Sequence, residues 1–133
     1  MNTEPKPASP TIVGQNQRLT QTLPFHDRQD FADAHRGFIS ALEPGVVRNA
    51  DGRVVWDNDS YAFLNGDAPD TVNPSLWRQS QLNAIQGLFE VVPGLYQVRG
   101  LDLSNISFVE GERGVIVIDP LISAETAAAA LGL

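Results

Sequence analysis

The sequence predicts an α/β fold made of α+β elements, in which hairpin strands combine with short helices. The main observation is the run at residues 115–118 (VIVI), which is β-branched and apolar at every position. A strand without a polar face is covered on both sides, so helices or a second sheet should lie above and below it. Apolar and polar residues alternate at positions 96–99, which is typical of a half-buried strand. Helix start signals occur before and after these strands.

The strand at residues 115–118 is predicted to pair with the apolar segment at residues 106–109. Between them lie residues 110–114 (EGERG), whose two glycines can reverse the chain. Asp119 and Pro120 then end the strand, because proline cannot donate to a β-ladder. The Asp119 carboxylate is therefore expected at the edge of the sheet, where α/β and sandwich proteins place site residues.

A second hairpin is predicted at residues 46–56. An Asp-Gly pair lies between two β-branched runs there, and glycine tolerates the positive φ that such a turn needs. A cluster of large apolar side chains follows, which could pack in the core or line a substrate site. Its members are Trp56, Tyr61, Phe63 and Leu64.

Three helices are predicted from apolar spacing and from capping residues. Residues 27–42 repeat apolar side chains at intervals of three and four. Residues 70–89 should form a helix that begins after Asn73, an N-cap residue followed by proline at the first helical position. Ser123 should cap a final, alanine-rich helix at residues 124–131.

The chain divides into three predicted regions. Residues 1–21, which are rich in proline and then in polar side chains, are expected to form an extended or disordered arm. Residues 22–93 are expected to form a helical region with a β-hairpin. Residues 94–133 are expected to supply the first strands and a helix of an incomplete domain. The isolated chain should then expose a strand edge and aggregate or be molten.

Charge and composition limit the partners of the protein. The net charge is −7 and no basic patch occurs, which disfavours binding to nucleic acid or to an acidic membrane surface. The N-terminal segment has no apolar run long enough for a Sec leader or a membrane anchor. We therefore expect a cytoplasmic protein without membrane insertion. Because the chain has no cysteine, any metal would need histidine and carboxylate ligands.

The chain contains two histidines, His26 and His35, as candidate ligands or bases. They are nine residues apart and off the helical period, so we interpret them as solvated or hydrogen-bonded side chains. Asp27, Asp30 and Asp33 share one helical face, which is also how a solvated face beside arginines looks. No metal ligand is therefore predicted in this chain.

Four segments carry a family resemblance. They are DTVNPSLWRQ at residues 70–79, GLFEVV at 87–92, GLYQVRGLDLSN at 94–105 and VIVIDPLISAETA at 115–127. Together they resemble the N-terminal part of bacterial alkyl sulfatases, the dodecyl sulfate hydrolases of the metallo-β-lactamase superfamily. This resemblance implies the first part of an αββα sandwich, ending before the zinc motif. Similar proteins hydrolyse alkyl sulfate esters, including dodecyl sulfate, to alcohol and sulfate.

The resemblance also implies two zinc ions in the complete enzyme, but none on this chain alone. The family's ligands come mainly from a THxHxDH motif, which is absent from this sequence. Asp119 matches the superfamily's first motif, an acid that braces the metal-binding loop in relatives. An acid that merely ends a strand and opens a turn is the other interpretation. Asn105 is a candidate for the same cleft or for a turn-forming role, and no catalytic residue is assigned.

The expected function is therefore the N-terminal portion of a zinc-dependent alkyl sulfatase, inactive alone, with an alkyl sulfate substrate and a homodimer formed through other regions. The first alternative is a truncated, non-catalytic protein of the same ancestry. The second is another hydrolase of the same superfamily, such as a thioesterase or lactonase, although the long family-specific phrases argue against it. An HxHxDH motif is expected within roughly 40 residues downstream of Leu133, about one further βα unit.

Overall fold

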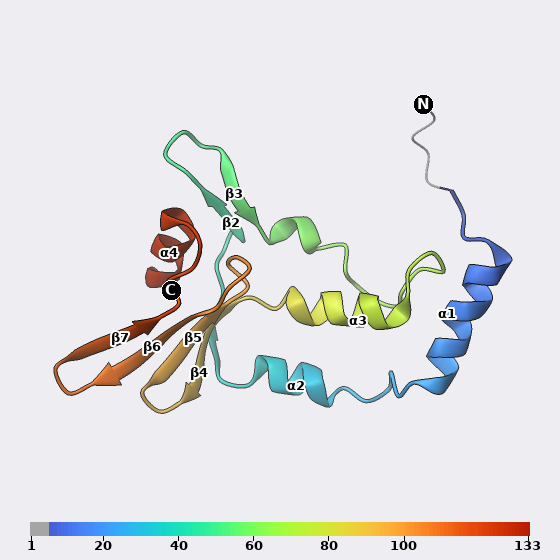
Figure 1. The fold of residues 1–133 in the computed structure, drawn as a ribbon, viewed down its shortest axis with the longest axis horizontal. Helices are drawn as coiled ribbons and strands as arrows, with labels where there is room; N and C mark the ends of the chain where they lie inside the picture. Colours follow the sequence, from blue (N-terminus) through green and yellow to red (C-terminus); the bar gives the residue numbers. More distant parts are fainter. Residues whose placement is uncertain (1–5) are drawn as a thin grey trace.

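A computed structural model describes residues 6–133, and it confirms the predicted mixture of helices and sheet. The helices are α1 (Pro10–Thr22), α2 (Gln29–His35), α3 (Pro74–Asn83) and α4 (Ala124–Leu131), with a short 3-10 turn at Asp59–Tyr61. The strands are β1 (Phe38–Ser40), β2 (Val46–Arg48), β3 (Val54–Asp57), β4 (Gly87–Val92), β5 (Leu95–Arg99), β6 (Ile106–Gly111) and β7 (Gly114–Ile118). Helices α2 and α3 extend away from the strands, and α1 lies at their far end (Figure 1).

Five strands form an antiparallel sheet in the order β1-β4-β5-β6-β7, while β2 and β3 form a separate hairpin. Both predicted turns are confirmed. Gly111 pairs with Gly114 where β6 reverses into β7. In the other hairpin the Gly52 N–H donates to the Asn49 carbonyl at 2.9 Å. The two hairpins therefore follow from their local turn residues.

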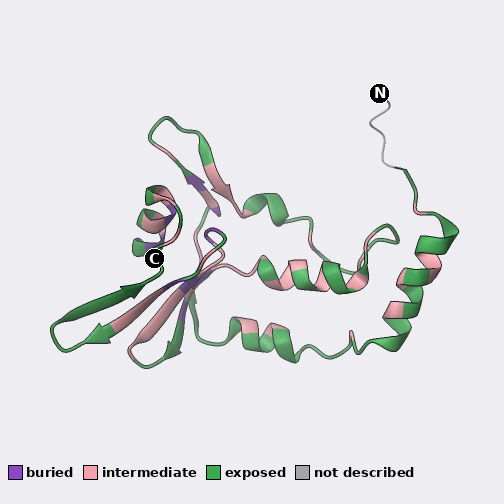
Figure 2. Cartoon of the chain, in the orientation of Figure 1, coloured by how far each residue is buried: buried purple, intermediate pink, exposed green. Residues whose placement is uncertain are grey.

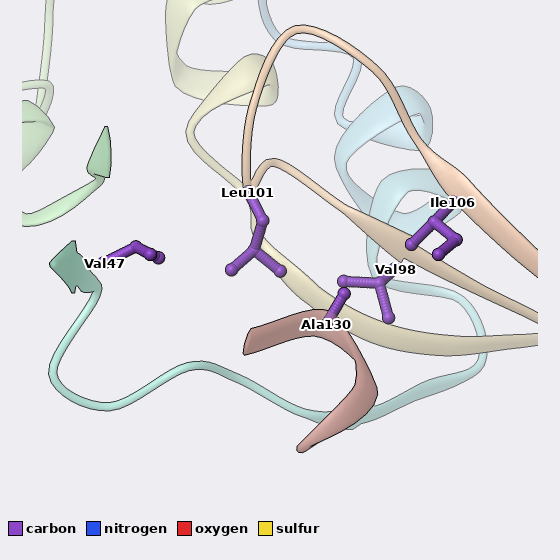
Figure 3. Close-up of a cluster of buried hydrophobic side chains, with 5 residues drawn as sticks. All are labelled: Val47, Val98, Leu101, Ile106 and Ala130. Carbon is purple, nitrogen blue, oxygen red and sulfur yellow. The ribbon is translucent and has the colours of Figure 1, made fainter. Parts of the chain in front are cut away.

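One face of the five-stranded sheet packs against α4. The buried cluster there consists of Val47, Val98, Leu101, Ile106 and Ala130. Figure 3 shows these side chains, which come from β5, β6, the loop between those two strands, the hairpin strand β2 and α4. Because burial of apolar surface is the main favourable term in folding, this cluster fixes α4 and the β2–β3 hairpin against the sheet.

Phe89 anchors the opposite face of the sheet and is completely buried. Leu88 pairs with Val98 and therefore points to the face that packs against α4. Because successive side chains of a strand point to opposite faces, Phe89 points to the other face. The Phe38 ring meets it edge-on, with 5.5 Å between ring centroids. The Arg99 guanidinium carbon lies 3.5 Å from the Phe89 ring centroid, and Arg99 Nη2 donates to the Ala34 carbonyl at 3.3 Å. These contacts attach α2 and β1 to this face.

Strand β7 forms where it is predicted, but residues 6–133 do not supply the layers expected on both its sides. Its side chains Val115, Ile116, Val117 and Ile118 are 48–62% exposed. The strand lies at one edge of the sheet, and Figure 2 shows it exposed along its length. Within the described residues its outer edge therefore presents unpaired backbone groups and an apolar surface.

Two of the predicted helices are shorter than expected. The segment at residues 27–42 is helical only as α2, because Gly37 adopts φ +72° and the chain continues as β1. The segment at residues 70–89 begins as predicted, with Asn73 Oδ1 accepting from the Ser75 N–H at 2.9 Å. It ends at Asn83, and Gly87 at φ +138° begins β4. Pairing between β1 and β4 replaces both predicted helix ends.

Residues 10–22 form α1, and not the extended or disordered arm that composition predicts. Ser9 caps the helix by accepting from the Ile12 N–H at 3.4 Å, and Pro10 occupies the first helical position. Asn16 Nδ2 donates to the Asp70 carbonyl at 2.8 Å, which ties α1 to the segment before α3. The part of the predicted arm at residues 1–5 lies outside the described residues.

Arg78 joins α3 to the segment that precedes α2. Its guanidinium donates to the Phe25 and Asp27 carbonyls and forms an ion pair with Asp30. The hydrogen bond from Arg78 holds the pKa of Asp30 below its ordinary value, against the opposing effect of desolvation. Helices α2 and α3 are thereby held side by side, in the position where both contribute to the lining of one cavity.

Candidate functional site

Two loops meet at one end of the sheet. Strand β5 ends, β6 begins and β7 ends at this end of the sheet, because the three strands are antiparallel neighbours. The β5–β6 loop covers residues 100–105, and the β7–α4 loop covers residues 119–123. The loops contain both sequence-predicted site residues, Asn105 and Asp119.

Asp102 connects the two loops. Its side chain is 7% exposed, and its Oδ1 accepts from the Ser104 N–H of its own loop at 2.7 Å. Its Oδ2 accepts from the Ile122 N–H at 2.9 Å and from the Thr126 hydroxyl at 3.0 Å. Sequence reasoning missed this residue. The available signal was an acid between two leucines, with the Asp-x-Ser spacing of an Asx turn.

Asp119 lies directly after β7, at the sheet edge where the sequence places it. The residue is exposed and its φ is +53°. Leu121, two residues on, also has a positive φ of +69°. Such values are unusual for residues with a side chain and mark a sharply turned loop. Asp119 therefore lies in the β7–α4 loop, which Asp102 connects to the β5–β6 loop that carries Asn105.

A cavity of about 580 Å³ lies between the β5–β6 loop, α3 and the segment after β3. Asn105 and Asp102 are part of its lining. Its apolar wall includes Trp56, Tyr61, Phe63, Leu64, Leu82, Ile85 and Leu103. All four members of the aromatic and aliphatic cluster predicted from the sequence therefore line this cavity. Phe63 is 65% exposed, so this cluster does not form a closed core.

Hydrogen bonds fix the polar side of the cavity. The Trp56 indole N–H donates to the Gly100 carbonyl at 3.0 Å, and Asn58 Nδ2 donates to the same carbonyl at 2.8 Å. Arg99 also lines the cavity, and desolvation lowers the pKa of its guanidinium. The β3 end and the β5–β6 loop are therefore held together by the backbone of Gly100.

The histidines and the predicted acidic face do not join this site. His35 Nδ1 lies 2.8 Å from the Phe31 carbonyl, within its own helix, and His26 lies in the connection between α1 and α2. Asp30 pairs with Arg78, and Asp33 pairs with Arg36. In the described part of the chain, no group of three or more His, Asp or Glu side chains could hold a metal ion. The loops and the cavity therefore form an apolar recess beside a carboxylate-braced turn.

Comparisons with known proteins show that the chain is similar in sequence to alkylsulfatases, which are sulfuric ester hydrolases. It is 55% identical over 129 residues to an (R)-specific secondary-alkylsulfatase of Pseudomonas sp, and 52% identical over 130 residues to a linear primary-alkylsulfatase of Pseudomonas sp. It is 48% identical over 129 residues to an alkyl/aryl-sulfatase of Saccharomyces cerevisiae. Each alignment covers 96% of this chain. No protein-family model matches the sequence.

A solved structure shows the same fold. A stereoselective inverting sec-alkylsulfatase from Pseudomonas sp. matches 99% of this chain with a TM-score of 0.91 and 53% sequence identity. The chain covers 21% of that structure and 19–20% of the curated relatives. It therefore spans about a fifth of the length of the proteins that it matches. Among the described residues, no helix has both the length and the apolar character to cross a membrane.

Proposed function

We propose that this chain is part of a hydrolase that cleaves alkyl sulfate esters, such as dodecyl sulfate, to alcohol and sulfate. The observation that carries the proposal is identity of 48–55% to three alkylsulfatases along 96% of the chain. The similarity of the fold to that of a sec-alkylsulfatase, with a TM-score of 0.91, supports it. Because those relatives act on secondary, primary and alkyl/aryl esters by name, the shared substrate class is the sulfate ester itself.

In this proposal the cavity between α3 and the β5–β6 loop receives the alkyl chain. Its volume of about 580 Å³ is within the usual range of small-molecule sites. Its wall is rich in aromatic and aliphatic side chains, whereas Asn105 and Asp102 lie on its polar side. An amphiphilic ester would therefore place its tail against the wall and its sulfate toward Asn105, because the Asp102 oxygens are already occupied by protein donors.

The resemblance to the metallo-β-lactamase superfamily implies two zinc ions in the complete enzyme. The described residues do not fit a two-zinc centre. His26 and His35 lie away from the loops, and residues 6–133 contain no three-residue ligand cluster. Zinc in the proposed enzyme would therefore take its ligands from outside these residues. What this chain contributes is the cavity wall and the turn that carries Asp119. A cytoplasmic location and a homodimer formed through other regions complete the proposal.

Sulfate release tests the proposed function. The 133-residue chain is expected to release no sulfate from dodecyl sulfate and to bind zinc weakly or not at all, because two-metal hydrolysis needs several converging ligands. The natural polypeptide that carries this sequence is expected to release sulfate and to bind zinc. Zinc-dependent turnover by the 133-residue chain would contradict this assignment of roles. A natural polypeptide inactive on primary, secondary and aryl sulfate esters would favour the non-catalytic alternative.

The cavity assignment predicts a chain-length effect. Phe63→Ser in the natural polypeptide should raise KM for dodecyl sulfate roughly tenfold, because losing about 1.4 kcal/mol of apolar contact changes affinity by that factor. KM for a short ester such as butyl sulfate should change less, since its shorter tail buries less apolar surface against the wall. Leu76→Ser is the matched control, because Leu76 is 61% exposed and outside the cavity lining. Equal effects on KM for both esters would show that the cavity does not bind the alkyl chain.

A further inference from the structure

Among residues 6–133, Asp102 and Thr126 are the two buried polar side chains, and they contact each other. Thr126 is 1% exposed, and its hydroxyl donates to Asp102 Oδ2. The Ser123 hydroxyl lies 2.9 Å from the Thr126 hydroxyl, so the cap of α4 belongs to the same network. The network joins the β5–β6 loop to the start of α4 across 24 residues of sequence.

The Asp102 carboxylate accepts three hydrogen bonds but has no cationic partner. Within the described residues, the ion pairs are those of Asp33 with Arg36 and of Asp30 with Arg78. A buried carboxylate without a cation is unfavourable by comparison with an apolar side chain of similar size. Its three donors offset that unfavourable desolvation. What the carboxylate supplies beyond an apolar residue is a fixed geometry between two loops.

The geometry that Asp102 fixes is the turn after β7. Asp119 and Leu121 both have positive φ, which disfavours each by about 1–2 kcal/mol relative to the ordinary right-handed regions. The next residue, Ile122, donates its N–H to Asp102 Oδ2 at 2.9 Å. This bond therefore holds the end of a turn that would otherwise relax.

We propose that Asp102 is a positioning residue of the sulfatase site. Its buried carboxylate holds the turn at residues 119–122 in its strained conformation and so sets the direction of Asp119 relative to Asn105. Asp102 does this through the Ile122 N–H and the Thr126 hydroxyl, without touching the substrate. The inference rests on the proposed function, since it assigns a role within that site.

The hydrogen bonds around Asp102 require a carboxylate at this position. Both of its oxygens receive donors, one from Ser104 and the other from Ile122 and Thr126. An asparagine in the same place would direct its NH₂ group at one of these donors, whichever way the amide is turned. Asp102→Asn should therefore release one side of the connection while preserving the size of the side chain.

The test uses the natural polypeptide that carries this sequence, with dodecyl sulfate as substrate. Thr126→Val removes the hydroxyl at nearly constant shape, Thr126→Ser retains it, and Thr71→Val makes the same change at an exposed position outside the site. For Thr126→Val and for Asp102→Asn we expect kcat to fall roughly tenfold with little change in KM, as misplacement of a reacting group predicts. Thr126→Ser should restore kcat, and Thr71→Val should not alter it. Hydrogen exchange at the Ile122 amide should accelerate in the two impaired variants.

Each failure has a distinct meaning. An inactive wild-type polypeptide would refute the proposed function, and exchange at Ile122 would then still report whether Asp102 holds the turn. An active wild type, with kcat unchanged in a folded Thr126→Val or Asp102→Asn variant, would overturn the positioning role alone. Loss of the thermal unfolding transition in both variants would also overturn it, because the pair would then serve folding and not the site.

Discussion

Gly87→Ala is expected to disrupt the edge of the sheet that carries β1, with a loss of about 4 kcal/mol or more in the free energy of unfolding. An alanine Cβ at this position would lie 2.2 Å from the Ser40 carbonyl oxygen and 3.2 Å from the Ala41 Cα. Both atoms are backbone, so no side chain can move to relieve the collision. The backbone φ of +138° adds strain that only glycine avoids.

Gly52→Ala is the matched control for this substitution. Gly52 also has a positive φ, of +80°, but a Cβ there would meet no atom within 4 Å. Its effect should therefore be limited to the left-handed backbone, about 1–2 kcal/mol. Thermal unfolding of the two variants of the natural polypeptide, followed by circular dichroism, measures the difference. Similar losses in both would show that the close approach between β1 and β4 does not determine the fold here.

Asp119→Ala is expected to lower sulfate release by the natural polypeptide roughly 10–100-fold, the usual effect of losing a carboxylate that orients metal ligands. The residue is exposed at the end of β7, so its removal should leave the thermal unfolding midpoint nearly unchanged. The zinc content of the purified variant should fall or its turnover per zinc should decrease.

His26→Ala and His35→Ala are the controls for Asp119→Ala. His26 lies in the connection before α2, and His35 bonds within that helix, so neither faces the two loops. Both variants should retain sulfate release. Full activity of Asp119→Ala would assign that carboxylate to the turn alone, which is the other interpretation of an acid at a strand end. Loss of activity on changing either histidine would contradict the proposal that the zinc ligands lie outside residues 6–133.

The β2–β3 and β6–β7 hairpins and the starts of α3 and α4 could be predicted because their causes are local. Asn73 and Ser123 cap α3 and α4 through backbone N–H groups two or three residues away. The β2–β3 and β6–β7 turns depend on glycines within the turns themselves. Asp119 could likewise be placed at a strand end, because Pro120 stops the ladder. The family resemblance was also contained in contiguous segments, and the comparisons confirm it.

Long-range contacts decided what the sequence left open. Apolar spacing favoured helix at Phe38 and Phe89, yet their rings meet edge-on in neighbouring strands, because two glycines permit the close approach of β1 and β4. The cluster of Trp56, Tyr61, Phe63 and Leu64 lines a cavity because α3 and the β5–β6 loop, which are distant in the sequence, form its other walls.

The sequence by itself determined two hairpin turns, the starts of α3 and α4, the acidic charge, the lack of cysteine and the alkylsulfatase resemblance, because each depends on residue type and near neighbours. Only the tertiary structure decided that Asp102 is buried and connects two loops. Its donors at Ile122 and Thr126 lie 20 and 24 residues along the chain, and nothing in the spacing of these residues indicates that they meet. Burial and hydrogen-bond partners of a polar side chain depend on how distant segments pack, which is why this residue emerged from the fold.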